Sequence, residues 1–251
     1  NVMGTAHVLE AARAASSVRA VVAVTTDKVY RNQEDGRAYR EEEPLGGHDP
    51  YSASKAAAEI VAESYRLSFF SVPGTAAVAT ARAGNVIGGG DWSTDRLVPD
   101  CVRAFRGGQP VVLRSPAAIR PWQHVLDPLV GYVKLAAQLL NDPELRFAQA
   151  WNFGPAESDT ASVGDVANEV ARMWGKGAAI EVGSSEGQPH EAALLSIDSK
   201  RARSQLGWVS TWDLETSLRK TVDWYQAWDR NENMCDFSRR QVLDYLDLLD
   251  A

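Results

Sequence analysis

The feature that most constrains the fold is a helix-like segment followed by a strand-like apolar segment, twice in succession. Apolar residues at helical spacing predict a helix over residues 2–15, and VRAVVAVTT at 18–26 is typical of a strand buried on both faces. A second helix begins within DPYSASK at 49–55, and GTAAVATARAG at 74–84 predicts a second buried strand. The alternation indicates βαβ units, so we expect an α/β protein with a parallel sheet.

The rest of the chain predicts a mixture of shorter helices and strands. A glycine-rich loop, GNVIGGGDWSTD, follows the second strand. Ser162 and Asp165 form a start similar to a capping box, and an apolar stripe from Leu214 to Trp228 predicts a helix packed on a core. Both of these late helices are interpreted as packing elements. Further helices are expected at 96–108 and 126–140, and strands at 110–114 and 150–155.

Composition narrows the classes of function. The chain has 251 residues, enough for one large domain or two modest ones. Its formal charge of −7 argues against a nucleic acid or an anionic membrane as the main partner, so an anionic substrate must be held by a few local cations. No apolar run reaches the roughly 18 residues of a membrane span. Cys101 and Cys235 match no metal or redox spacing, which predicts a reducing, cytoplasmic location and no bound metal.

Three polar residues stand where the first strand ends. Ligands of open parallel sheets bind beyond the carboxyl ends of the strands, and Thr26, Asp27 and Lys28 occupy such an end. A hydroxyl donor, a carboxyl acid and an amine base side by side form a plausible catalytic set. The alternative is a strand-to-loop transition with solvated charges.

Tyr51 and Lys55 are four residues apart at a helix start, and so lie on one helix face. A phenol ordinarily titrates near 10, but a neighbouring ammonium and a helix N-terminus both favour the phenolate. Pro50 suits the first turn of the helix. The pair could therefore supply a base, or it could be an ordinary exposed Tyr and Lys, since this spacing alone is weak.

Together these features resemble the extended short-chain dehydrogenase/reductase family. A strand ending in Thr-Asp-Lys, then Tyr51 and Lys55, then a strand ending ARAGNVIG carries the resemblance, which runs nearly end to end. It implies a partial Rossmann-type parallel sheet with a smaller mixed α/β substrate-binding domain, and NAD as cofactor. Tyr51 would be the base for hydride transfer, Lys55 would favour its phenolate and hold the nicotinamide ribose, and Thr26 would hydrogen-bond the reacting sugar hydroxyl.

Longer strings point to one branch of that family. TTDKVY, EEEPLGGHDPYSASK, ARAGNVIGGGDW, DRLVPD, IRPWQHVLDPLVGY and WNFGP together resemble the CDP-glucose 4,6-dehydratases. The related dTDP-glucose enzymes carry Asp-Glu after the active-site Thr, whereas this chain has Asp27-Lys28, and many epimerases lack both the acid and the base. The resemblance implies a lyase that converts CDP-glucose to CDP-4-keto-6-deoxyglucose and regenerates NAD.

The resemblance also implies a mechanism. Tyr51 would take the proton from the C4 hydroxyl as hydride leaves C4 for NAD. Lys28, or a water that it positions, would then remove the proton at C5, and Asp27 would protonate the C6 hydroxyl as it departs. Hydride returns to C6. To act as the base itself, Lys28 must be substantially neutral, which needs desolvation or nearby cations.

Other residues match the family's binding positions. The resemblance assigns Asn1, Thr25 and Arg82 to the cofactor site, beside Tyr51 and Lys55. It assigns five residues to the sugar nucleotide, and these are Asn85, Arg96, Leu97, Arg120 and Asn152.

Some of these assignments have simpler alternatives. Arg120 suits bidentate phosphate contact but could be a surface ion pair, and Asn152 could belong to a strand-end turn. His124 is expected to be packed and hydrogen-bonded rather than catalytic. The glycines at 88–90 do not spell a dinucleotide fingerprint, and indicate loop flexibility or a close backbone approach to substrate. Trp92 and Trp122 would flank the pocket.

The resemblance divides the chain into two domains. Residues 1–85, with 121–155 returning to them, would form the C-terminal half of an NAD-binding Rossmann domain. Residues 86–120 and 156–251 would form the sugar-nucleotide-binding domain. A homodimer or higher homo-oligomer is implied, with the helices at 2–15 and 52–66 at the interface.

The family's first βαβ unit, with its glycine-rich pyrophosphate loop, is not among these 251 residues. We therefore expect either that a segment precedes the sequence or that the chain is a fragment unable to turn over alone, with strand edges left unpaired. Two other functions stay open. One is a sugar-nucleotide epimerase or decarboxylase of the same fold, and the other is a non-catalytic sugar-nucleotide-binding module.

Overall fold

A computed structural model describes residues 1–156, 159–183 and 195–249, and the chain divides into two compact units. The first unit comprises Asn1–Gly84, Pro128–Gly154 and Leu195–Val209, and the second comprises Asn85–Asp127, Pro155–Leu194 and Ser210–Ala251. Residues 195–209, which the sequence assigned to the second domain, thus lie in the first unit. The reason is local packing, because α6 (Lys200–Leu206) packs on a strand of the first unit.

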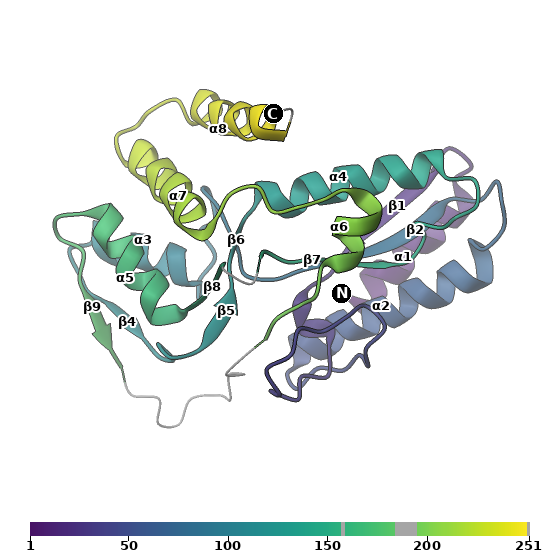
Figure 1. Cartoon of the computed structure of the whole chain (residues 1–251), viewed down its shortest axis with the longest axis horizontal. Helices are drawn as coiled ribbons and strands as arrows, with labels where there is room; N and C mark the ends of the chain where they lie inside the picture. The colour runs from purple at the N-terminus through teal and green to yellow at the C-terminus, as the bar shows by residue number, and fades with distance from the viewer. Residues whose placement is uncertain (157–158, 184–194, 250–251) are drawn as a thin grey trace. The chain divides into compact units, whose positions relative to one another are not determined.

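The first unit is built on a three-stranded parallel sheet. Its strands are β1 (Ala20–Val24), β2 (Ala77–Ala83) and β7 (Ala150–Phe153), in the order β1-β2-β7. Figure 1 shows α1 (Val2–Ala14) and α2 (Pro50–Phe69) on one face of this sheet and α4 (Leu126–Asn141) on the other. The α/β class and the parallel sheet predicted from the sequence are confirmed.

Burial explains why β2 is the central strand. All seven of its residues are buried, and its alanines and valine let helices approach closely. On the α1–α2 side a small core is formed by Leu9, Ala12, Ala62, Phe70, Ala76 and Val78. Among the described strands β1 pairs with β2 alone, and the side chain of Val24 is 48% exposed. One edge of this sheet is therefore unpaired in the described residues.

The opposite edge of the sheet is covered by two loops. The backbone N–H of Asn152 on β7 donates to the carboxylate of Glu41 at 3.0 Å, and the Asn152 side chain donates to the carbonyl oxygens of Tyr39 and Asp198. A parallel bridge joins Tyr39 to Ile197. The acidic loop before α2 and the segment before α6 thus satisfy the polar edge of β7, as an edge strand requires.

The second unit is a mixed α/β arrangement of short strands and longer helices (Figure 1). Its strands pair two by two, in parallel for β3 with β6 and β4 with β9, and antiparallel for β5 with β8. The strands are β3 (Val86–Ile87), β4 (Val111–Leu113), β5 (Ile119–Pro121), β6 (Gln123–His124), β8 (Thr160–Ser162) and β9 (Ile180–Val182). The helices are α3 (Leu97–Arg106), α5 (Val163–Trp174), α7 (Leu214–Asp229) and α8 (Met234–Leu249).

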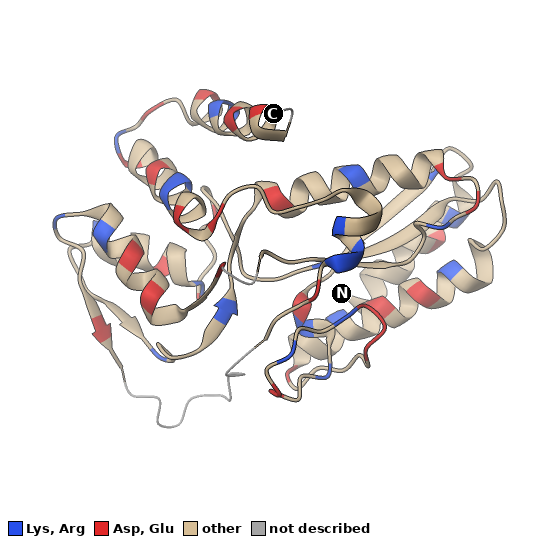
Figure 2. Ribbon diagram, in the orientation of Figure 1, with Lys and Arg blue, Asp and Glu red and all other residues tan. Residues whose placement is uncertain are grey.

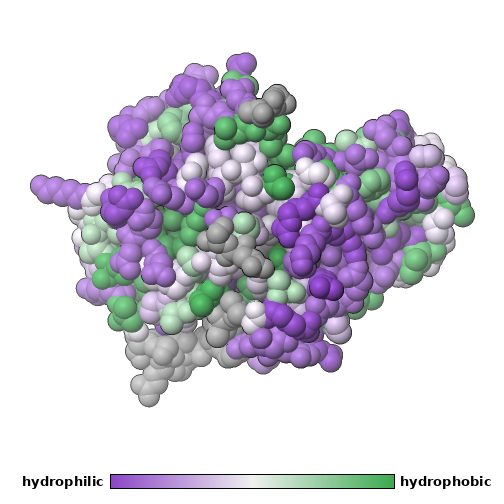
Figure 3. Space-filling model, in the orientation of Figure 1, coloured by the Kyte–Doolittle hydropathy of each residue, from purple (hydrophilic) through white to green (hydrophobic). Residues whose placement is uncertain are grey.

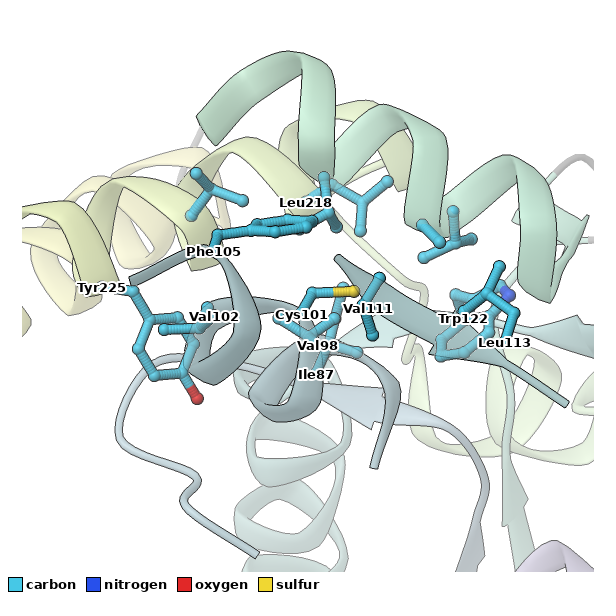
Figure 4. Packing of buried hydrophobic residues seen from close by; sticks show 14 residues of the cluster. Ile87, Val98, Cys101, Val102, Phe105, Val111, Leu113, Trp122, Leu218 and Tyr225 are labelled. Carbon is cyan, nitrogen blue, oxygen red and sulfur yellow. The ribbon is translucent and has the colours of Figure 1, made fainter. Parts of the chain in front are cut away.

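One apolar cluster in the second unit packs α3, α5 and α7 against β3 and β4. Figure 4 shows Val98, Cys101, Val102 and Phe105 of α3 among side chains from the strands and from α7. Leu218, Val222 and Tyr225 belong to the stripe that the sequence predicted for α7. The late helices are thus packing elements, as expected, and Ser162 caps α5 by accepting the backbone N–H of Asp165 at 3.0 Å.

Two helices were not predicted from the sequence, α6 and α8. Gln241 and Tyr245 of α8 are buried, whereas Leu243, Leu246 and Leu248 are exposed. Acidic and basic residues are interspersed along the helices (Figure 2), and hydrophilic residues cover much of the face in Figure 3. None of the described helices is long and apolar enough to cross a membrane.

Candidate active site

Shortly after β1 the chain forms a single 3-10 turn, η1 (Asp27–Val29), with Thr26 as its N-cap. The Thr26 hydroxyl donates to a carboxylate oxygen of Asp27 at 2.9 Å and accepts from the backbone N–H of Lys28. Asp27 is 2% exposed, whereas Lys28 is exposed. The alternative of a loop with solvated charges therefore fits Lys28 alone, since the Thr26 hydroxyl and the Asp27 carboxyl are a buried, hydrogen-bonded pair.

Gly84 follows β2 directly and stands against the Asp27 carboxyl. A Cβ placed on Gly84 would be 1.9 Å from Oδ2 of Asp27 and 2.2 Å from its carboxyl carbon. Any side chain at position 84 would therefore displace the carboxyl. The glycine in ARAGN is explained by this close approach.

Asp49 sets the start of the helix that carries Tyr51 and Lys55. Its carboxylate accepts the backbone N–H groups of Tyr51 at 2.9 Å and Ser52 at 3.0 Å, and the Ser52 hydroxyl at 2.5 Å. These hydrogen bonds lower the pKa of the Asp49 carboxyl, and the bond from the Ser52 hydroxyl has the largest effect. Asp49 is thus the N-cap, and Pro50 takes the first helical position, where a missing N–H costs nothing.

Tyr51 and Lys55 stand on the first two turns of α2. The phenol of Tyr51 is about half exposed, with 49% of the residue accessible. The ammonium of Lys55 donates to the carbonyl oxygen of Val24, the last residue of β1, at 3.1 Å. Since α2 also packs against η1, the structure brings the five predicted catalytic residues to the carboxyl end of β1, within one unit.

A buried ion pair, which the sequence did not reveal, lies on the same face of α2. Glu59 is 3% exposed, and one of its oxygens accepts from Arg82 on β2 at 2.7 Å and from the Thr80 hydroxyl at 2.7 Å. Its other oxygen accepts the Thr25 hydroxyl at 2.5 Å. Burial raises the pKa of Glu59, but the hydrogen bond and charge of Arg82, with Thr25 and Thr80, outweigh burial and hold the pKa below its usual value.

Two residues assigned to ligands are instead engaged within the protein. Arg82 is 3% exposed and donates to the Tyr30 hydroxyl at 2.8 Å and to the carbonyl oxygen of Glu41 at 3.0 Å, besides Glu59. Asn152 is fully buried, and its side chain accepts from Tyr30 and donates to two carbonyl oxygens. Their contacts give no support to a cofactor role for Arg82 or a substrate role for Asn152, which lies within β7 rather than in a turn at its end.

Three groups could contact a dinucleotide at this edge of the first unit. Lys55 is half-buried, and its ammonium donates one of its three N–H groups to the carbonyl oxygen of Val24. The other two can donate to ribose hydroxyls. The exposed phenol of Tyr51 lies one helical turn away. The Asn1 side chain donates to the hydroxyl of Ser54 at 2.7 Å, on the same turn of α2. This donor set fits the nicotinamide ribose of NAD, while the hydroxyl of Thr25 is occupied by Glu59.

The remaining predicted binding residues belong to the second unit. Asn85 has a φ of +45°, which asparagine tolerates well, and its carbonyl oxygen accepts the backbone N–H of Gln123. Arg96, exposed at the N-cap of α3, pairs with Asp91 at 3.0 Å, and half-buried Leu97 begins the helix. Arg120 on β5 is 6% exposed, so it lies buried rather than in a surface ion pair.

The glycine-rich loop of the second unit has a packing explanation. A Cβ on Gly89 would be 2.0 Å from the indole of Trp224, and one on Gly88 would be 2.7 Å from Val125. The close approach is thus to side chains of the protein. Trp92 is 38% exposed and packs on Tyr225.

The aromatic residues near β5 and β6 are mostly buried. Trp122 is buried and donates its indole N–H to the carbonyl oxygen of Ala161. His124 is packed and hydrogen-bonded, as predicted. Its Nδ1 accepts the backbone N–H of Leu126, and its ring stands edge-on to Trp212. Burial, with a smaller effect of Lys220, lowers the pKa of His124 to about 3. Within the described residues, no group of three His, Cys, Asp or Glu side chains could hold a metal ion.

Comparison with known proteins gives a consistent family. A sequence model of the GDP-mannose 4,6 dehydratase family matches residues 1–221. A CDP-glucose 4,6-dehydratase of Salmonella typhimurium is 45% identical over 250 residues, covering 98% of this chain and 69% of that protein. The structure resembles the dTDP-glucose 4,6-dehydratase of Bacillus anthracis in complex with NAD (TM-score 0.77, 23% identity, 91% of this chain, 68% of that one). It also resembles the Streptomyces venezuelae enzyme of that activity with NAD bound (TM-score 0.75, 25% identity, 90% and 65%).

Proposed function

The chain belongs to the GDP-mannose 4,6-dehydratase family, and we propose that it is an NAD-dependent hydro-lyase that converts CDP-glucose to CDP-4-keto-6-deoxyglucose. The observation that carries the proposal is the buried Thr26–Asp27 pair at the end of β1, beside the helix that bears Tyr51 and Lys55. An acid, a hydroxyl and a phenol–ammonium pair are the groups that oxidation followed by loss of water requires. The 45% identity to the Salmonella enzyme supports CDP-glucose as the substrate.

The cofactor is NAD, which the dTDP-glucose 4,6-dehydratases of the same fold contain. When bound, it would supply the acceptor for hydride from C4 and give that hydride back to C6, while a proton is restored at C5. Lys55 would hold the nicotinamide ribose with the donors that Val24 leaves unused, and Asn1 would add a contact from the neighbouring turn. The Thr25 hydroxyl is bound to Glu59, so it supports no direct contact of that side chain with the cofactor.

Tyr51 takes the proton of the C4 hydroxyl. The residue is about half exposed at the N-terminal turn of α2, one helical turn from the Lys55 ammonium. Thr26 binds the same sugar hydroxyl. Its own hydrogen is donated to Asp27, so its oxygen accepts the hydroxyl hydrogen before Tyr51 removes it.

Asp27 protonates the C6 hydroxyl as it leaves. The buried site and its contact with Gly84 hold the carboxyl in one place, so the proton is delivered from a fixed position. Lys28 is exposed at the same turn, and we assign it to positioning the water that removes the proton at C5. Asp27 and Lys28 together serve the elimination, and Tyr51 serves the oxidation.

The second unit would bind the nucleotide. Arg96 and Arg120 would hold the diphosphate, since a guanidinium forms bidentate contacts to phosphate. Asn85 would offer its amide to the sugar nucleotide from a backbone position fixed by the positive φ, and Leu97 would line the entry to α3. Because the chain carries a net charge of −7, a small number of arginines must supply the attraction for the substrate.

We further propose a homodimer that packs through α1 and α2. These helices pack on each other. Four of their large apolar residues nevertheless have more than half of their surface exposed, namely Met3 (64%), Val8 (60%), Ile60 (56%) and Leu67 (65%). Exposed apolar residues gathered on two helices are typical of an interface between subunits. Cys101 and Cys235 are both free, which suits a reducing, cytoplasmic compartment.

The test is incubation with CDP-glucose and NAD, using protein expressed together with any sequence that its gene places before Asn1. We expect a 4-keto-6-deoxy sugar nucleotide, identified by mass spectrometry and NMR, and a lower kcat/KM with dTDP-glucose. A product epimerised at C2 or C4, or decarboxylated, would replace the dehydratase with another enzyme of this fold. Binding of CDP-glucose without turnover, unchanged in Tyr51→Phe, would indicate a non-catalytic module.

A further inference from the structure

We infer that the buried Glu59–Arg82 pair is a positioning pair, which fixes the helix bearing Tyr51 and Lys55 against the strand end bearing Thr26 and Asp27. The inference rests on the proposed function for its catalytic readout. It goes beyond that function because neither residue touches the reacting groups, and because Arg82 takes a role other than binding the cofactor.

The first support is the spacing along α2. Tyr51, Lys55 and Glu59 stand at successive intervals of four residues, and therefore follow one another along one face of the helix. Lys55 contacts Val24, and Glu59 contacts the next residue, Thr25. The helix is thus joined to the end of β1 at two consecutive residues, immediately before Thr26.

The second support is that both oxygens of the Glu59 carboxylate accept hydrogen bonds. Thr25 occupies one oxygen at 2.5 Å, while Thr80 and Arg82 share the other at 2.7 Å each. The Thr25 backbone N–H in turn donates to the carbonyl oxygen of Ala81 on β2 at 2.8 Å. One helix residue is therefore tied to two neighbouring strands, which prevents α2 from sliding or rotating on the sheet.

The third support is the contact that Arg82 makes with Tyr30. Arg82 extends from β2 to the hydroxyl of Tyr30 at 2.8 Å, and its guanidinium carbon lies 5.1 Å from the centre of the Tyr30 ring. Tyr30 directly follows η1, so the turn that carries Asp27 and Lys28 is held on its other side. Burial, the largest effect, raises the pKa of Tyr30 to about 12, and the phenol stays protonated and donates to Asn152 at 2.7 Å.

The energetic cost of burying two charges indicates that the Glu59–Arg82 pair serves to position the helix rather than to stabilise the fold. Removing two charges from water is costly, and replacing a buried ion pair with apolar residues of similar size is often neutral or stabilising. A buried pair contributes a defined geometry that apolar side chains do not, because its hydrogen bonds fix both distance and direction. Here the groups it orients are the ones that carry the proposed chemistry.

The experiment replaces both members so that no buried charge is left alone. Glu59→Leu with Arg82→Met removes the pair, and Glu59→Gln with Arg82→Met keeps an acceptor for Thr25. Glu63→Gln, one turn further along α2 in a more exposed pair with Arg66, is the matched control. Steady-state kinetics are measured together with amide hydrogen exchange of peptides that cover residues 24–30 and 50–56.

We expect the apolar double variant to fold and to lose about 100-fold in kcat, with KM for CDP-glucose within about twofold of the parent. The variant that keeps the acceptor should recover part of the loss, and Glu63→Gln should match the parent. Amide exchange at residues 24–30 and 50–56 should become faster in the apolar double variant, while peptides of α5 stay unchanged.

A folded apolar double variant with parental kcat and parental exchange would overturn the inference. Faster exchange throughout the first unit with kcat lost only in proportion to the unfolded fraction would also overturn it, because the pair would then act on stability alone. If the parent itself fails to dehydrate CDP-glucose, the proposed function fails, and the exchange measurement still decides whether the pair fixes α2 on β1.

Discussion

The backbone of Gly84 lies so close to the carboxyl group of Asp27 that only a residue without a side chain fits at position 84. A Cβ on Gly84 would fall 1.9 Å from Oδ2 of Asp27, well inside any allowed contact. Both residues are buried, so the carboxyl has little room to move aside. The end of β2 is therefore part of the machinery that positions the proposed acid.

We expect Gly84→Ala to impair the elimination selectively. The added methyl group displaces the Asp27 carboxyl, and a misplaced acid costs about 10²-fold in the rate of water loss. C4 oxidation, which Tyr51 serves, should be affected much less. The two steps can be followed separately by the absorbance of the reduced cofactor in a single turnover and by mass spectrometry of the product.

Gly4→Ala is the matched control for this substitution. Gly4 lies in α1, nothing stands within 4 Å of its added Cβ, and alanine is the better helix former by about 1 kcal/mol. This variant should keep parental activity. Equal loss of oxidation and elimination in Gly84→Ala would contradict a specific contact with the acid.

Asp27→Asn should separate the two halves of the reaction. The amide keeps the size of the side chain and can still accept from Thr26, but it has no proton to give to the leaving C6 hydroxyl. Oxidation at C4 should proceed, and water loss should fall by about 10²- to 10⁴-fold. Rapid-quench mass spectrometry would then show a 4-keto glucose derivative that retains its C6 oxygen. Normal formation of the 6-deoxy product would remove Asp27 from the role of acid.

Tyr51→Phe should abolish the first step. The phenylalanine retains the ring but offers no oxygen to take the C4 proton, so reduced cofactor should not accumulate and kcat should fall by about 10²- to 10⁴-fold. Tyr65→Phe on the same helix is the control, because the Tyr65 ring packs on Phe69 away from the N-terminal turn. Comparable activity of both variants would mean that Tyr51 is not the base.

The sequence predicted the elements whose pattern is local. The valine- and alanine-rich runs became β1 and β2, and the Asp-Pro-Tyr start became a capped helix, because burial on both faces and N-capping act within a few residues. Strand-end position also placed Thr26 and Asp27 just beyond β1, where the structure has them. The short strands of the second unit were mostly missed, since two or three residues carry no period.

Partnerships between distant residues could not be predicted from spacing. Arg82 and Asn152 were assigned to ligands by the family resemblance, and nothing in their spacing indicated other partners. Their contacts are with Glu59, Tyr30 and Glu41, which the chain brings from three other segments. Glu59 itself was visible as an acid after three alanines in SKAAAE, but nothing in the sequence told which strand it would meet.

A charge on the exposed face of α1 or α2 should dissociate the proposed dimer. Val8→Glu or Leu67→Glu places a carboxylate among apolar side chains that are 60% and 65% exposed in the single chain. Size-exclusion chromatography with light scattering should shift from a dimeric to a monomeric mass. Val133→Glu on α4, where valine is 70% exposed, is the control and should stay dimeric. A monomeric parent would contradict the interface.

His124 should make the second unit sensitive to acid. Its pKa falls from about 6.5 to about 3 on folding, so the folded state holds the neutral imidazole while the unfolded chain takes up a proton. The contribution of His124 is fully present above the unfolded value and is lost as pH falls from about 6.5 towards 3, at about 1.4 kcal/mol for each pH unit. Urea unfolding of His124→Gln between these pH values should show a weaker dependence of unfolding free energy on pH than the parent. His7→Gln, an exposed histidine on α1, should follow the parent, and an unchanged slope in His124→Gln would exclude a neutral buried imidazole.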